Sequence, residues 1–125
     1  MSLRGIRGAT VANDQSADAV LTATRELLLA LLDANPTLAK EDLASVLFTV
    51  TADLTAVHPA RAARELGWIE VPLMDALEIP VPGSLERCIR VLALWNTDLP
   101  ASQVNHVYLG AAAGLRPDLS PLFKS

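Results

Sequence analysis

Apolar side chains along the chain follow two periods, and each period predicts a different kind of element. Between Ser16 and Ala34 they recur every three to four residues, which is typical of one face of an amphipathic helix. Elsewhere they alternate with polar residues or form short continuous runs, which is typical of strands. The strands are expected at 3–11, 46–51, 68–73, 87–95 and 106–109.

Polar residues, proline and glycine mark the ends of the helices. Asp14 or Ser16 is the candidate cap of the long helix, and Asn35 with Pro36 ends it. A shorter helix is expected at 59–66, where proline occupies a first-turn position and glycine follows the last residue. Short helical turns are expected at 37–43 and 101–104.

The segment 78–83 holds Pro80 and Pro82 and is therefore expected to be a loop. The order of elements is then β-α-β-α-β-β-β. This order predicts an α+β or mixed α/β fold, with a single mixed β-sheet that carries helices on one face. The 125 residues are expected to form a single domain, 1–125, in which 115–125 is a candidate mobile tail.

The composition suggests that part of the surface is shared with other subunits. Hydrophobic residues make up 51% of the chain and charged residues 19%, and the mean hydropathy of +0.33 is high for a soluble domain, so an oligomer is expected. The formal charge of -4 argues against a nucleic-acid partner. Cys88 is the only cysteine, which excludes an internal disulfide. Without a signal-peptide or membrane-span pattern, we expect a soluble cytoplasmic protein that does not contact membranes.

Arg90 lies inside a predicted strand among apolar neighbours. A guanidinium cannot lose its proton, and without a partner in a core it would cost several kcal/mol. It must therefore meet a protein carboxylate, for which Glu78 is the candidate, or a bound anion. Arg7 leads to the same argument, on a strand where Gly5 and Gly8 leave the backbone bare for a close approach. Two such arginines favour an anionic ligand.

Two more polar side chains lie in apolar surroundings, Glu78 in a loop and Tyr108 in a short strand. Taken alone, a tyrosine in a strand is usually a core residue, and a glutamate beside a proline-rich loop is usually solvated. The chain lacks a phosphate-binding glycine loop, a dinucleotide fingerprint and paired ligands at metal spacing, and its two histidines, His58 and His106, are far apart. We therefore expect no metal and no cofactor, and a site that acts by orientation and electrostatics.

Five short motifs occur in the order and at the separations found in one known family. They are Arg4 to Thr10, Pro59 to Trp68, Cys88 to Val91, His106 to Leu109 and Leu115 to Leu119. Through them the chain resembles, over nearly its whole length, the monofunctional trimeric chorismate mutases of the Bacillus type. The resemblance implies a homotrimer that forms a pseudo α/β-barrel, with active sites at the subunit interfaces. It also implies the reaction, a Claisen-type pericyclic rearrangement of chorismate to prephenate in phenylalanine and tyrosine biosynthesis.

The resemblance implies a catalytic role for four residues. Arg90 would donate to the ether oxygen and to a carboxylate of the substrate, and Arg7 would donate to a carboxylate. Glu78 would accept from the ring hydroxyl, and Tyr108 would contact the side-chain carboxylate. This set suits a transition state in which negative charge develops on the ether oxygen and no proton moves.

The resemblance also implies a set of substrate-binding residues. They are Asp75, Leu115 and Arg116, together with His58, Arg61 and Arg64 from the neighbouring subunit. Two of them depart from the family pattern, because Asp75 stands where a cysteine is usual and His58 replaces an aromatic residue. A carboxylate at position 75 would repel a dianion unless it is protonated or paired with an arginine, or it faces solvent.

Two other functions use the same residues. One is a non-catalytic trimeric protein that binds a small dicarboxylate. The other is a trimeric small-domain enzyme acting on imines, although Glu78, Arg90 and Tyr108 would then have no assigned role. Loss of the ring-diene absorbance of added chorismate would separate these functions from a mutase.

Overall fold

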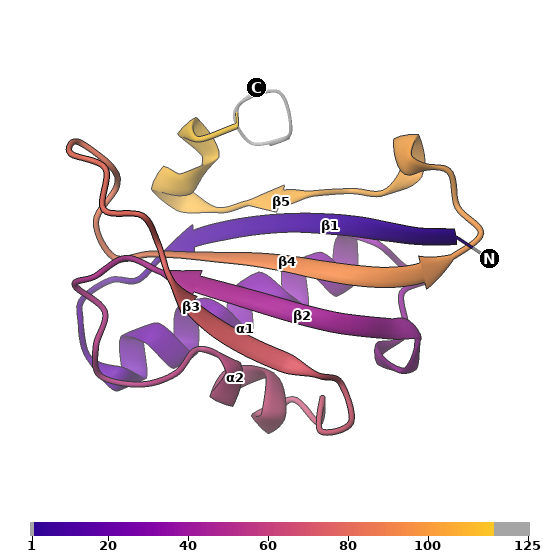
Figure 1. Ribbon diagram of the computed structural model, residues 1–125, viewed down its shortest axis with the longest axis horizontal. Helices are drawn as coiled ribbons and strands as arrows, with labels where there is room; N and C mark the ends of the chain where they lie inside the picture. Colours follow the sequence, from indigo (N-terminus) through magenta and orange to yellow (C-terminus); the bar gives the residue numbers. More distant parts are fainter. Residues whose placement is uncertain (1, 117–125) are drawn as a thin grey trace.

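The computed structural model describes residues 2–116, so most of the predicted tail, 117–125, lies outside the described residues. Five strands form one sheet in the order β3-β2-β4-β1-β5 (Figure 1). The strands are β1 (Ser2–Val11), β2 (Leu43–Val50), β3 (Leu73–Leu77), β4 (Cys88–Thr97) and β5 (Val107–Tyr108). The helices are α1 (Ala17–Ala34) and α2 (Ala60–Glu65), with short 3-10 turns η1 (Lys40–Asp42), η2 (Ala101–Gln103) and η3 (Gly110–Gly114).

The sheet is mixed, as predicted. β4 lies between β1 and β2 and is antiparallel to both, whereas β5 pairs with β1 and β3 pairs with β2 in parallel. The long helix begins where its polar signals indicated, because the Ser16 hydroxyl accepts the Ala19 N–H and Asp14 accepts the Ser16 N–H. The predicted α+β class and the order of the main elements are confirmed.

Both helices cover the same face of the sheet (Figure 1), so the core lies on that side. Phe48, Val91 and Trp95 point from the central strands into this core and are almost completely buried. Leu27 and Leu31 of α1 pack against them. Because side chains alternate along a strand, the residues between the buried ones face away from the helices.

The opposite face is open in the single chain. Leu92 on β4 is 40% exposed and Leu3 on β1 is 53% exposed, while Leu47 and Thr49 on β2 are half-buried. The near-continuous apolar run of β2 is typical of a strand that is buried on both faces, but the chain itself supplies full cover on only one. The long side chain of Arg90 also stands on this open face, at a position that alternates with buried Val91.

The strand predicted at 68–73 is wrong, because regular pairing begins only at Leu73. Pro72 has no N–H to donate, although its carbonyl accepts the Val46 N–H at 2.9 Å. Trp68 is buried although it is not in a strand, because its side chain packs in the core. Its backbone N–H donates to the Ala63 carbonyl at the end of α2. The turns predicted at 37–43 and 101–104 shorten to 3-10 turns, and the last strand shortens to Val107–Tyr108.

The close approach predicted at Gly8 is present, but protein atoms make it. A Cβ at Gly8 would lie 3.0 Å from Val91 Cγ1 and 3.1 Å from both Leu27 Cδ1 and the Val107 carbonyl oxygen. The bare backbone at this position therefore lets α1, β4 and β5 meet. No helix in the described part of the chain is long and apolar enough to cross a membrane.

Candidate active site

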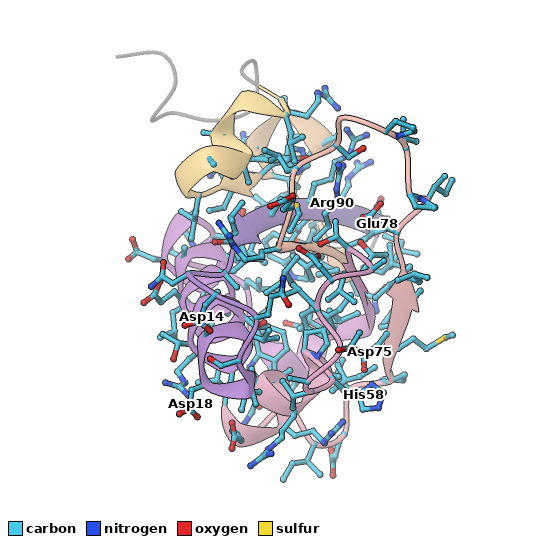
Figure 2. All side chains as sticks on the ribbon, turned by 90° about the vertical axis from the view of Figure 1, so that its left-hand side faces the viewer. Asp14, Asp18, His58, Asp75, Glu78 and Arg90 are labelled. Carbon is cyan, nitrogen blue, oxygen red and sulfur yellow. The ribbon has the colours of Figure 1, made fainter. Side chains whose placement is uncertain are left out.

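An ion pair joins β4 to the loop that follows β3, on the open face of the sheet. Arg90 Nε lies 3.2 Å from Glu78 Oε1, and the same carboxylate oxygen accepts a hydrogen bond from the Thr49 hydroxyl. Figure 2 shows Glu78 and Arg90 side by side. The chain thus supplies a carboxylate for Arg90. The Arg90 side chain is nonetheless 45% exposed, so the cation stands at an open surface instead of inside a closed core.

Backbone pairing fixes both members of the ion pair. Arg90 lies opposite Ala9 of β1 and opposite Thr49 of β2 in the sheet register. The Glu78 N–H donates to the Val50 carbonyl at 2.8 Å, immediately after β3 ends. Sequence reasoning missed Thr49, although a hydroxyl within an apolar strand is a signal that could have identified it.

These side chains line a surface hollow of about 270 Å³. Its polar lining comprises Arg7, Thr49, Glu78, Arg90 and Tyr108. The four residues predicted to be catalytic are therefore brought together from β1, β4, β5 and the loop after β3. Two guanidinium groups and one carboxylate leave an excess of one positive charge, so the hollow favours an anion.

Tyr108 combines the two roles that the sequence left open for it. It lies opposite Ala9 in the parallel β1–β5 pair, is 5% exposed and packs with Ala9 and Ala112. It is a core residue in this sense, and it also borders the hollow. Leu115 packs against the same small cluster, which places the start of the predicted tail next to Tyr108.

Asp75 and His58 lie together, away from this hollow (Figure 2). Asp75 Oδ1 accepts the Ala60 N–H at 3.0 Å, and its Oδ2 lies 3.6 Å from His58 Nδ1. Asp75 therefore satisfies one of the free N–H groups at the start of α2. The pair borders a second hollow of about 330 Å³, between the loop before α2 and the edge strand β3.

The predicted binding arginines also lie outside the Arg90 hollow. Arg61 and Arg64 are exposed on α2, where Arg61 Nε lies 3.6 Å from Glu65 Oε2. Arg116, after η3, is near enough to His106 to help lower the pKa of that imidazole. In a single chain these three cations are not gathered around one site.

A polar anchor not predicted from the sequence holds the end of the loop that carries Glu78. Asp53 accepts the Arg87 N–H at 2.9 Å and the Thr51 hydroxyl at 2.6 Å, and Arg87 has a φ of 52°. Burial raises the pKa of Asp53, but these two hydrogen bonds, a third from its own backbone N–H and the charge of Arg87 together leave the pKa below its usual value. β4 begins at the next residue, Cys88. Burial raises the pKa of the Cys88 thiol, partly offset by the guanidinium of Arg90.

Comparison with known proteins assigns this chain to a family. The model of the family chorismate mutase type I matches residues 3–119. The chain belongs to that family. Chorismate mutase AroH of Thermus thermophilus is 58% identical to it over 117 residues, which span 94% of this chain and 96% of the relative. Chorismate mutase AroH of Bacillus subtilis is 45% identical over 121 residues, 96% of this chain and 94% of the relative.

A solved structure extends the agreement to three dimensions. A chorismate mutase from Clostridium thermocellum matches this fold with a TM-score of 0.85 and 46% sequence identity, over 88% of this chain and 97% of that chain. The prediction of a chorismate mutase, an isomerase of aromatic amino acid biosynthesis, is confirmed. The residue roles that the resemblance implied remain predictions and are developed below.

Proposed function

We propose that this chorismate mutase converts chorismate to prephenate in the hollow formed by Arg7, Glu78, Arg90 and Tyr108. The observation that carries the proposal is the Arg90–Glu78 pair, with 3.2 Å between Nε and Oε1, in the lining of a hollow that also includes a second arginine. The site needs only charge and shape, because the rearrangement breaks a C–O bond and forms a C–C bond within one molecule without moving a proton. No metal and no cofactor enters this mechanism.

Arg90 acts on the charge that develops during the reaction. Glu78 engages Nε and so fixes the plane of the guanidinium, while the terminal amino groups carry the remaining donors. These donate to the ether oxygen as the breaking bond places negative charge on it, and to a substrate carboxylate. A donor aimed at charge that appears mainly in the transition state lowers the barrier more than it tightens substrate binding.

The other residues hold the substrate in its reactive conformer. Arg7 donates to one carboxylate, Tyr108 donates to the side-chain carboxylate, and Glu78 accepts from the ring hydroxyl. Thr49 is a positioning residue, since its hydroxyl already holds the Glu78 carboxylate. Bringing the two reacting ends together in a compact conformer removes much of the entropic part of the barrier.

The active enzyme is a homotrimer with its sites between subunits. Chorismate carries two carboxylates, whereas the hollow of one chain has an excess of only one positive charge. His58, Arg61 and Arg64 from a neighbouring subunit, with Arg116 and Leu115 of this chain, complete the cleft and its charge. Asp75 contacts His58 and the start of α2 within one chain, so it joins the cleft from the same side as they do. In the trimer, neighbouring subunits are expected to cover the apolar open face of the sheet. Threefold symmetry closes the assembly into a ring, so every subunit has the same two neighbours. We place the enzyme in the cytoplasm.

Arg90→Ala tests the mechanism. Chorismate consumption is followed by loss of its diene absorbance, and prephenate by its acid conversion to phenylpyruvate. We expect kcat to fall by about 10²- to 10³-fold, with a smaller change in KM, and Arg90→Lys to recover little of the loss because an ammonium lacks the planar fork. A folded Arg90→Ala trimer with normal turnover would overturn the mechanism. Binding of chorismate by the wild type without turnover would instead support the dicarboxylate-binding alternative.

A further inference from the structure

The segment before β5 is tied to the end of α1 by a pair of side-chain amides. Asn35 is 3% exposed; its Nδ2 donates to the Asn105 carbonyl and its Oδ1 accepts the Asn105 N–H, both at 2.9 Å. Asn105 returns a third bond, from its Nδ2 to the Ala34 carbonyl at 2.8 Å. The two Asn35 bonds satisfy both backbone groups of Asn105, as a neighbouring strand would. The backbone next to His106 is therefore fixed.

His106 completes the pairing of β5 with β1 through its side chain. The backbone pairs are Gly8 with Val107 and Ala9 with Tyr108, and no earlier residue pairs in this ladder. At the next position the Arg7 N–H donates to His106 Nδ1 at 2.9 Å, so the imidazole substitutes for a backbone acceptor. An Nδ1 that accepts a hydrogen bond carries no proton, so the ring is neutral and its proton is on Nε2.

We infer that His106 is a positioning residue, which sets Arg7 and Tyr108 relative to each other by accepting the Arg7 N–H on its neutral ring. The inference rests on the proposed function, in which Arg7 and Tyr108 bind the substrate carboxylates. Tyr108 is two residues beyond His106, on β5, and Arg7 immediately precedes the two residues of β1 that pair with β5. The ring thus links two substrate contacts from separate strands without having to touch the substrate itself.

The surroundings of the ring keep it neutral. Burial lowers the pKa of His106, and the guanidinium groups of Arg7, from β1, and Arg116, after η3, lower it further. The side chains that tie its neighbour to α1, Asn35 and Asn105, are uncharged. When acid does protonate the ring, Nδ1 becomes a donor that faces another donor, and the bond to Arg7 is lost. The link between the two strands therefore weakens as the pH falls through the lowered pKa.

Two substitutions separate the effect of the hydrogen-bond acceptor at position 106 from the effect of the imidazole ring itself. His106→Asn places an amide oxygen near the position of Nδ1 and cannot titrate, whereas His106→Leu has no acceptor. We expect kcat/KM of the Leu variant to fall by about 10- to 100-fold, mainly through KM, because the carboxylate contacts are misplaced. The Asn variant should stay within about threefold of the wild type at neutral pH. The wild type should show a decline in kcat/KM at acid pH, and the Asn variant should lack the part of that decline that comes from His106.

His58→Asn is the matched control, since His58 is the only other histidine of the chain. Whatever its effect on the absolute rate, the acid decline assigned to His106 should persist in it. With two histidines, nitrogen-15 imidazole spectra are readily assigned by comparing the two Asn variants. His106 should appear as the Nε2–H tautomer at neutral pH and titrate below the ordinary value of 6.5.

A His106 signal with the proton on Nδ1 would overturn the inference, and this measurement needs only wild-type protein and the Asn variants. A folded Leu variant with wild-type kcat/KM and an unchanged acid decline would overturn it as well. If the Leu variant does not fold, the tautomer of His106 and the dependence of kcat/KM on pH in the Asn variant still test the inference.

Arg7→Ala distinguishes a failure of the proposed function from a failure of the positioning role of His106. Full activity in that variant contradicts the proposed function, whereas a large loss there with none in His106→Leu contradicts only the positioning role.

Discussion

Replacement of Gly8 by alanine should disturb the fold and the site together, because the added methyl group would lie closer to three neighbouring atoms than ordinary contact allows. The new Cβ would lie 3.0 Å from Val91 Cγ1, and 3.1 Å from both Leu27 Cδ1 and the Val107 carbonyl oxygen. The two side chains could shift by a few tenths of an ångström. The carbonyl belongs to the backbone of β5 and can move only if β5 moves away from β1.

The size of the effect follows from two opposing contributions. Overpacking a tight core costs about 1–3 kcal/mol, while replacing glycine by alanine restricts the unfolded chain and returns about 0.4–1 kcal/mol. The net loss should be about 1–2 kcal/mol, which lowers the Tm of a domain of this size by about 4–8 °C. Because β5 carries Tyr108, we also expect kcat/KM for chorismate to fall by about tenfold.

Gly114→Ala is the control, since a Cβ there would meet nothing within 4 Å and its backbone does not require glycine. Its Tm should equal or slightly exceed that of the wild type. Thermal unfolding is compared at one protein concentration, because the stability of an oligomer depends on concentration. Equal Tm and equal kcat/KM for the two variants would refute the argument that Gly8 is required for the contact between strands.

Two further predictions concern carboxylates outside the hollow. Asp75→Ala should lower the free energy of unfolding by about 0.5–2 kcal/mol, because the Ala60 N–H loses its acceptor. Asp75→Asn keeps an oxygen acceptor and should retain most of that free energy. Urea unfolding of both variants checks this, and equal losses in the two would contradict it. The pKa of Asp53 is lowered in the folded state, so its contribution to stability is present above the unfolded value of 3.8 and is lost as the pH falls through the folded value. The difference in urea midpoint between wild type and Asp53→Asn should therefore be largest at neutral pH and shrink below about pH 4, and a constant difference would be evidence against the Arg87 anchor.

Long periodic segments were the part of the fold that the sequence predicted best. α1 and β4 have enough turns or alternations for the pattern to be clear, and the caps of α1 are local signals. β5 has only two paired residues, and its parallel pairing with β1 depends on Asn35 and His106. No local pattern encodes contacts between side chains about 70 to 100 positions apart.

The candidate site was predictable in part for a similar reason. The chemistry of Arg7 and Arg90 followed from cations placed in apolar strands, but their convergence with Tyr108 came from the resemblance to the family. The apolar residues around Arg90 predicted a position in a core, because a sequence pattern cannot show that one face of the sheet is not covered by the chain's own helices. The contact between Asp75 and the start of α2 was missed because it depends on how a helix and an edge strand pack.

The sheet order has a consequence for how the protein is made on the ribosome. β1 is synthesised first, yet its two neighbours, β4 and β5, are among the last elements to emerge. Arg7 and His106 are 99 residues apart, so at about 5–20 residues per second the first strand waits about 5–20 s for its last partner. During that time its backbone edges are open to pairing with other nascent chains. Arg4 and Arg7 are the charged residues of β1, and charges within a strand disfavour such pairing, so we expect both to protect the nascent chain before either has a part in the finished enzyme.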